Sequence, residues 1–384
     1  MNKSRCVKQF VVVASVAVSL FIGCSRSDQT PPTNPAPSPD AVNTPTVTAD
    51  QAMQKGLDFL RAHQAADGAY RIGDANLPVD IGVTGLVLKA MASSPQASRE
   101  NDPSIAKAVQ FLLAHQEADG GIRGPMLGTY TTSIAIVALE ALQNPKYKDN
   151  IDRAVAYVKT QQYSGATGPD SYKNGGFGYG STMRPDLSNT QMAFDAFQAA
   201  GLAKDDPAYS EAIKFISRCQ NNSETNDLPV AGTDGGAYYN PVESKAGDYL
   251  KPDGTKGWRS YGSMTYALVK SMIYANLPKE DPRIQAAVGW IKKNYTLDEN
   301  PGMGKAGLYY YYHTVAKALS AYGEDVITDD KGVQHKWREE LTAKLLSLQR
   351  PDGSLVNEKD RWGEDNPVLV TSYAFISLQE AAGK

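Results

Sequence analysis

The sequence predicts an all-α protein, an (α/α)6 toroid in which six helical hairpins form an inner and an outer ring of helices. Three observations lead to this fold class. A short helical phrase recurs about every fifty residues, a glycine turn follows nearly every copy, and an apolar helical segment follows each turn. A repeat period of roughly 20–50 residues is typical of arrays built from one supersecondary unit.

The recurring phrase is an amphipathic helix with an apolar pair, an aromatic residue and a final glutamine. Its copies are residues 56–64, 108–116, 154–162, 212–220, 287–295 and 341–349. The glutamines expected to hold neighbouring repeats together are Gln64, Gln116, Gln162, Gln220 and Gln349. Tyr295 replaces the glutamine in the fifth copy, and Lys344 replaces the aromatic residue in the sixth. A single apolar stripe on each helix predicts the outer ring.

The second helical segment of each unit is apolar on nearly all sides and carries few charges. These segments are residues 83–91, 131–142, 189–197, 263–272, 312–322 and 370–378. Helices that are apolar all round are buried, so these segments predict the inner ring. Glycines such as Gly68 and Gly120 supply the positive φ that ends a helix. Aligned at one shared position, the inner segments read Thr84, Thr132, Thr190, Met264, His313 and Thr371.

The toroid is predicted to cover residues 50–384, and the residues before it have other roles. Residues 1–23 have the charged start and uncharged run of a signal peptide. Residues 24–49 are rich in Pro, Ser and Thr, which predicts a disordered tether. The stretch LFIGC resembles the bacterial lipobox, which implies a lipid on Cys24 and an extracytoplasmic, membrane-anchored protein. A plain secretory cleavage near Cys24 is the alternative.

Composition excludes some classes of function. The formal net charge is -3 with both signs interspersed, and no basic stripe marks a nucleic-acid surface. Cys219 is the single cysteine in the predicted toroid, so no intramolecular disulfide is expected.

The ring of hairpins, with a glutamine at the end of the outer helix and Gly-aromatic after it, resembles the terpenoid cyclase and protein prenyltransferase superfamily. The α/α toroids of that superfamily carry the QW repeat, and GLDFLRAHQAADGAY and AVQFLLAHQEADGGI look most like it. The resemblance covers roughly residues 50–384. It implies the toroid fold, but it implies less about function because the QW element is structural.

One segment resembles the acid motif of the cyclases. Residues 185–194, PDLSNTQMAF, are similar to the DxDDTA motif of squalene–hopene-type cyclases, whose middle Asp protonates the substrate. Asp186 matches the first Asp, Ser188 stands at the proton donor and Asn189 at the last Asp. A hydroxyl group does not protonate an alkene. Asp186 therefore remains the catalytic candidate. The alternative is a helix N-cap whose ionised form the helix dipole stabilises.

Residues 307–319, GLYYYYHTVAKAL, resemble the prenyltransferase segment that supplies a zinc-ligand histidine, here His313. The partner segment, residues 257–269, contains neither the Asp nor the Cys that the resemblance requires. One imidazole does not make a zinc site, so no metal and no cofactor are predicted.

We expect the turns and inner-helix starts to line a cavity inside the ring. The expected lining residues are Tyr130, Tyr179, Ser188, Asn189, Trp258, Tyr261, Tyr309 and His313. Aromatic faces hold isoprenoid chains and stabilise cations, although simple packing is the alternative. Loop carboxylates leave a glycan-active toroid as a minor alternative, and a solvated loop explains them more simply. These carboxylates are Asp234, Asp248, Glu364 and Asp365.

Two classes of function therefore stay open. The first is a non-catalytic toroid that binds a lipid, an isoprenoid or a protein partner, with the long loop 221–257 as lid or partner surface. The second is a cyclase-like or prenyltransferase-like enzyme that uses Asp186. The missing donor acid and the missing zinc ligands favour the binding toroid.

Overall fold

The computed structural model describes residues 49–72, 80–93 and 101–383. The chain divides into two units, Met1–Thr46 and Val47–Lys384, and the following concerns the second unit alone. The predicted signal peptide, Cys24 and all of the tether except Ala49 lie outside the described residues. Within the described part of the chain, no helix is long and apolar enough to span a membrane.

The described residues form helices that alternate between two layers. The outer helices are α1 (Ala49–Ala62), α3 (Pro103–Ala114), α5 (Lys148–Thr160), α7 (Pro207–Ser217), α9 (Pro282–Asn294) and α11 (Trp337–Leu348). The inner helices are α2 (Asp80–Ser93), α4 (Gly128–Ala141), α6 (Leu187–Ala199), α8 (Gly262–Tyr274), α10 (Leu308–Tyr322) and α12 (Pro367–Ala381). Short 3-10 turns are η1 (Pro145–Tyr147), η2 (Gly168–Lys173) and η3 (Arg361–Gly363).

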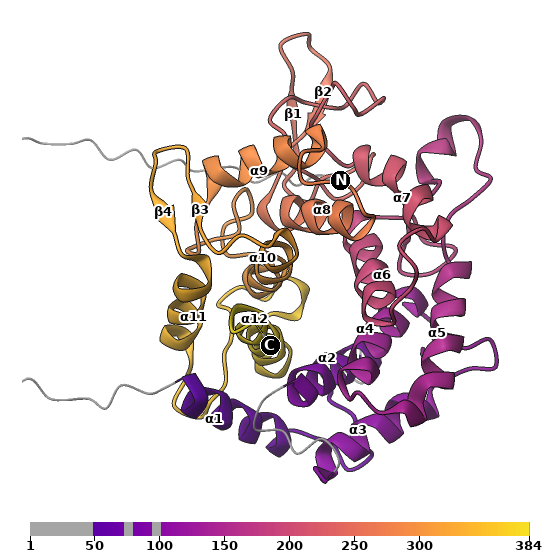
Figure 1. Cartoon of the computed structure of the whole chain (residues 1–384), viewed down its shortest axis with the longest axis vertical. Helices are drawn as coiled ribbons and strands as arrows, with labels where there is room; N and C mark the ends of the chain where they lie inside the picture. The colour runs from indigo at the N-terminus through magenta and orange to yellow at the C-terminus, as the bar shows by residue number, and fades with distance from the viewer. Residues whose placement is uncertain (1–48, 73–79, 94–100, 384) are drawn as a thin grey trace, which may run out of the picture. The chain divides into compact units, whose positions relative to one another are not determined.

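The inner helices form a closed ring within this unit, and the outer helices lie outside it (Figure 1). Each inner helix packs on the next, and α12 packs on α2. The predicted (α/α)6 toroid is thereby confirmed. One detail differs, because α3, α5 and α9 pack most extensively on the inner helices that precede them, α2, α4 and α8. After α3, α5 and α9 the turn therefore leads the chain to the next inner helix of the ring, whereas α7 and α11 pack mainly on the inner helices that follow them.

Asp-Pro pairs begin three of the outer helices. The N-caps Asp102, Asp206 and Asp281 each accept the backbone N–H two residues on, at 2.8–3.0 Å, and a proline follows each of them. Both features favour a helix start, because the cap satisfies a donor that has no partner and proline presets φ.

A threonine ties five of the inner helices to the preceding turn. The hydroxyl groups of these threonines accept a turn N–H at 2.9–3.1 Å, and the residues are Thr84, Thr132, Thr190, Thr265 and Thr371. This contact corrects the sequence alignment in α8, where Thr265 and not Met264 is the equivalent residue. In α10, Thr314 bonds a carbonyl of its own helix, so the predicted equivalence of His313 is not supported by this contact.

The repeated glutamines join neighbouring hairpins. Each side-chain amide donates to the glycine carbonyl of its own turn, at 2.9–3.1 Å, and to a carbonyl in the next outer helix, at 2.8–2.9 Å. Gln349 donates to the Ala52 carbonyl and so joins α11 to α1, the last and the first of the outer helices. In the fifth copy, the Tyr295 hydroxyl donates to Glu340 of α11 and provides a link of the same kind.

The turn requires glycine because it touches the next outer helix. Gly120 has φ of 93°, and a Cβ there would lie 2.3 Å from the carbonyl oxygen of Arg153. Gly68, at φ of 91°, meets the carbonyl of Lys107 in the same way. The helical phrase and the turn after it therefore recur because each junction between hairpins needs the same glutamine and the same glycine.

Replacing Gln116 with alanine is expected to lower the free energy of unfolding by about 1 kcal/mol or more. Its amide donates to Gly120 and Asn150, and its oxygen accepts from the Asn150 side chain at 2.6 Å, so the substitution leaves several half-buried groups without a partner. Thermal and denaturant unfolding measure the loss, with exposed Gln110 replaced by alanine as control. Equal stability of parent and Gln116→Ala would contradict this role.

The long loop 221–257 is partly folded. It contains β1 (Asp248–Leu250), which pairs antiparallel with β2 (Lys256–Trp258), so that Asp248 lies opposite Trp258. The side chain of Asn221 holds the loop base by accepting from the Gly232 N–H at 2.8 Å and donating to the Trp258 carbonyl at 2.7 Å. A second small hairpin, β3 (Ile327–Thr328) with β4 (Gln334–His335), precedes α11.

Candidate functional site

Asp186 caps the inner helix α6. Its Oδ1 accepts the Asn189 N–H at 2.8 Å, and its Oδ2 accepts the Asn189 side-chain amide at 2.7 Å. Only 1% of the residue is exposed. Both oxygens therefore accept hydrogen bonds from Asn189, and almost none of the residue is accessible to solvent.

The pKa of Asp186 differs from the expectation for a helix N-cap. Burial raises it from 3.8 to about 6, although hydrogen bonds from Asn189 and Tyr239 and the charge of Lys245 act in the opposite direction. The helix terminus therefore does not keep this carboxyl group at its ordinary acidity, because removal from water outweighs the donors.

Tyrosines and polar side chains lie near Asp186. Ser188, at the position of the cyclase proton donor, shares a hydrogen bond of 2.7 Å with the Tyr310 hydroxyl, to which Gln191 also donates at 2.6 Å. The rings of Tyr310 and Tyr373 lie 5.9 Å apart, and Tyr130 and Tyr179 are at the same distance. We call Tyr130, Tyr179, Tyr310 and Tyr373 the tyrosine layer. Three of these tyrosines, Tyr130, Tyr179 and Tyr310, are half-buried, and Tyr373 is buried.

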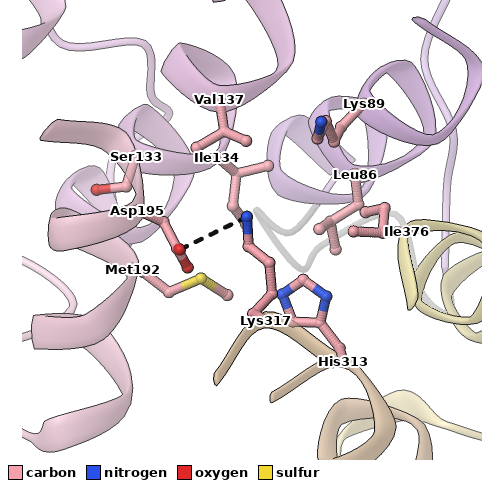
Figure 2. A pocket seen from close by; sticks show the side chains of 10 residues that line it. All are labelled: Leu86, Lys89, Ser133, Ile134, Val137, Met192, Asp195, His313, Lys317 and Ile376. Atoms are coloured by element: carbon pink, nitrogen blue, oxygen red, sulfur yellow. Dashed lines mark ion pairs between the residues drawn. The ribbon is translucent and has the colours of Figure 1, made fainter. Parts of the chain in front are cut away.

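A small cavity lies between the middle parts of the inner helices (Figure 2). Its volume is about 30 Å³. The residues that line it are Leu86, Lys89, Ser133, Ile134, Val137, Met192, Asp195, His313, Lys317 and Ile376. Of the residues predicted to line a cavity, His313 alone belongs to this lining, and the others lie elsewhere.

The remaining predicted residues have structural contacts. Tyr261 is the N-cap of α8 and is 3% exposed. The Tyr309 N–H donates to Glu364 at 3.2 Å. Trp258 does not line the cavity at the ring centre. It belongs to the β1–β2 hairpin, and its indole N–H donates to the Pro241 carbonyl at 3.2 Å.

The loop carboxylates differ in their surroundings. Glu364 is 1% exposed and accepts from the first turn of α10 and from Asn357, so the expectation of a solvated loop is wrong at this position. Asp234 accepts from Gly236 and Ser260, and Asp248 forms an ion pair with Lys256. Asp365 is exposed. Each of the first three is engaged in a local contact, which gives the glycan-active alternative no free pair of carboxylates among them.

An ionic cluster that the sequence analysis missed lies beside the cavity. Asp195 and Lys270 are both buried, with 2.6 Å between carboxylate oxygen and ammonium nitrogen. Lys317 is 3.8 Å from Asp195 and 3.2 Å from Glu380. Burial opposes the charge on Asp195, but Lys270 and Lys317 hold its pKa below the ordinary value. The cluster therefore connects α6, α8, α10 and α12 across the centre of the ring.

A sequence signal for this cluster exists. Charges are rare on the inner helices, and three of the few lie five residues after the shared threonine: Lys89, Asp195 and Lys270. The signal in α8 was obscured because the alignment used Met264 in place of Thr265.

His313 is uncharged at neutral pH. Burial lowers its pKa to about 3, with Lys270 and Lys317 adding to the shift and Asp195 opposing it. Its Nδ1 has no hydrogen-bond partner. Among the described residues, no group of three His, Cys, Asp or Glu side chains is arranged to hold a metal ion.

Comparisons with known proteins agree with this architecture. The squalene-hopene cyclase C-terminal domain family matches residues 72–236. A comparison with curated proteins gave no match. Among solved structures, the type II terpene cyclase MstE from Scytonema is similar with a TM-score of 0.55 and 14% identity, over 87% of this chain and 99% of that one.

Two further structures share the fold. The GH76A α-1,6-mannanase from Salegentibacter has a TM-score of 0.57 and 11% identity, over 88% of this chain and 99% of its own. Protein geranylgeranyltransferase-I of Candida albicans, complexed with GGPP, has a TM-score of 0.53 and 14% identity, over 85% and 90%. At such low identity these similarities establish the toroid fold, and the chemistry must be judged from the site.

Proposed function

We propose that this protein is a non-catalytic toroid that binds a protein partner through loop 221–257, on the extracytoplasmic side of a membrane to which Cys24 anchors it. The observation that carries the proposal is the small volume of the cavity at the ring centre. Its cavity of about 30 Å³ has room for about two water molecules, and charged groups line it. An isoprenoid chain does not fit this cavity, which supports a binding role over cyclase-like chemistry at the ring centre.

The residues at the position of the cyclase acid motif also support a non-catalytic role. Ser188 stands where the donor acid is needed, and both oxygens of Asp186 already accept hydrogen bonds within α6. A general acid must reach the atom that it protonates. With 1% of Asp186 exposed, that reach is missing.

Loop 221–257 carries the features of a binding surface. Its β1–β2 hairpin extends beyond the ring of helices (Figure 1). Leu250 at the end of β1 is 77% exposed, and Val242 in the same loop is 37% exposed. Lys256 lies over the Trp258 ring, 4.9 Å from the ring centre. Aromatic residues are enriched in protein interfaces, and a firmly held loop loses little entropy when it binds.

A photo-crosslinking amino acid at position 250, in the full-length chain expressed in its own cells, tests this proposal. We expect one adduct of defined mass, identified by mass spectrometry. The same amino acid at Val333, an apolar residue 51% exposed in the β3–β4 hairpin, is the matched control and is expected to give none. Absence of an adduct at 250, or the same adducts at both positions, would refute the proposed surface.

An active cyclase-like enzyme is the second candidate. Two observations favour it, namely the fold shared with the terpene cyclase MstE and the raised pKa of Asp186. Carboxyl groups with raised pKa values are common among catalytic acids. The substitutions at Asp186 in the Discussion separate the two candidates.

A further inference from the structure

The β1–β2 hairpin is a sheet of two strands, so one edge of β1 is not covered by another strand of the described chain. In an antiparallel pair, backbone hydrogen bonds join the strands at every second residue. The Arg259 N–H donates to the Gly247 carbonyl at 3.0 Å, and the Lys251 N–H donates to the Thr255 carbonyl at 2.8 Å. In the observed register, this spacing makes Tyr249 the bonded residue between Gly247 and Lys251.

The two residues between these bonded positions, Asp248 and Leu250, direct their backbone groups to the free edge of β1. Leu250 is 77% exposed, and within the part of the chain that the structure describes its N–H and C=O have no hydrogen-bond partner. The Asp248 N–H faces the same way, whereas the Asp248 carbonyl accepts from Arg259 Nε at 3.1 Å. An added strand would therefore find both backbone groups of Leu250 and the N–H of Asp248.

The charged side chains next to this edge are engaged within the loop. Proteins commonly use charged residues to keep a free edge from pairing with another chain. Here Asp248 forms an ion pair with Lys256 of β2 at 2.6 Å, and the Lys251 ammonium group donates to the Pro229 carbonyl. The side chain that remains exposed along the edge is the apolar one of Leu250, so β1 lacks the usual protection.

We propose that the partner adds an extended segment to the free edge of β1, as the third strand of this sheet. The inference rests on the proposed partner surface of loop 221–257 and specifies how the partner binds there. Two-stranded hairpins are marginally stable, and an added strand extends the ladder through main-chain hydrogen bonds.

The side chains around the edge define the chemistry of the added segment. Side chains of a strand alternate between the two faces of a sheet, so Leu250 lies on the same face as Trp258, which is opposite Asp248. An apolar side chain of the partner fits beside Leu250 on this face. Arg259 belongs to the other face, is exposed and reaches the edge at Asp248, where an acidic side chain complements its charge. The segment therefore alternates apolar and acidic residues.

Variants at position 250 test the strand addition in the full-length chain, with a photo-crosslinking amino acid at Val242. Val242 follows Pro241, whose carbonyl accepts from the Trp258 indole, so it lies near the apolar face. Leu250→Pro removes the edge N–H and is compatible with the β1–β2 ladder, because proline is tolerated where the N–H points out of the sheet. We expect loss of the adduct in Leu250→Pro. The matched control Leu250→Thr keeps the N–H and a residue that favours strands, and it should retain the adduct.

Hydrogen exchange of the purified Leu250→Pro protein, measured by mass spectrometry, is expected to show residues 247–259 protected as in the parent. Lost protection would contradict the outward direction of the Leu250 N–H. An adduct that persists in Leu250→Pro, or an equal loss in Leu250→Thr, would overturn strand addition and leave the partner surface standing. No adduct in the parent would overturn the surface and this inference together. An adduct between two copies of this chain would overturn the assignment to a different protein.

Discussion

Replacing Asp195 with alanine is expected to lower the free energy of unfolding by about 3–5 kcal/mol. The substitution leaves Lys270, which is fully buried, without its partner at 2.6 Å, and it removes the carboxylate that Lys317 also faces. Breaking a buried pair by removing one ion costs this much because the other charge stays away from water uncompensated. Urea unfolding at pH 7 measures the loss.

A double variant separates charge from packing. Asp195→Leu combined with Lys270→Met is expected to recover most of the loss, because buried ion pairs are often no more stable than apolar residues of similar volume. Asp205→Ala, at an exposed position in the loop after α6, is the control and should change stability little. A loss below about 1 kcal/mol in Asp195→Ala would contradict the buried cluster.

The loss should also depend on pH. The folded pKa of Asp195 lies below its ordinary value, so its stabilising contribution is present above the unfolded pKa and disappears as pH falls through the folded one. The difference between parent and Asp195→Ala is therefore expected to be largest near neutral pH and to shrink in acid.

Replacing Asp186 with asparagine is expected to preserve the fold and to raise stability at pH 7 by up to about 3 kcal/mol. That upper limit corresponds to the rise in pKa from 3.8 to about 6, which measures the cost of keeping the buried carboxyl group ionised. Asparagine still accepts the Asn189 N–H. The new amide can donate to Asn189 Oδ1, which has no partner in the parent, once the Asn189 side chain turns over.

The sign of the pH effect follows from the raised pKa. A group that binds protons more tightly in the folded state stabilises fully below its unfolded pKa and loses this contribution as pH rises through the folded one. Asp186 should therefore stabilise the parent near pH 4 and cease to do so above about pH 6. The stability difference between Asp186→Asn and parent should grow from pH 4 to pH 7, and a flat difference would show that Asp186 is not buried as described.

Replacing Asp186 with alanine has the opposite effect. It removes the N-cap and leaves the backbone and side-chain donors of Asn189 without an acceptor, at an expected cost of about 2 kcal/mol or more. Turnover of squalene or a prenyl substrate is measured beside stability for both variants. If the parent shows turnover that both variants lose while they stay folded, Asp186 is a catalytic acid and the non-catalytic proposal fails.

Local patterns were sufficient to predict the toroid. The glutamine, the glycine turn and the alternation of amphipathic and apolar helices act within one hairpin or between neighbouring hairpins. The same sequence features are therefore needed in every repeat. Gln116 and Gly120 could thus be assigned structural roles before their contacts were known. Even the irregular Tyr295 fits this scheme, since its hydroxyl reaches α11 as the glutamines reach their own neighbours.

The candidate site depended on contacts between distant parts of the chain. The sequence by itself determined the six hairpins, the inner and outer layers and the absence of a donor acid at Ser188. It did not determine that Asp186 would be buried deeply enough to raise its pKa. Asp195 and Lys270 are 75 residues apart and meet only because α6 and α8 are neighbours in the closed ring. Burial, charge compensation and cavity volume arise from that closure, so only the tertiary structure decided what occupies the centre of this toroid.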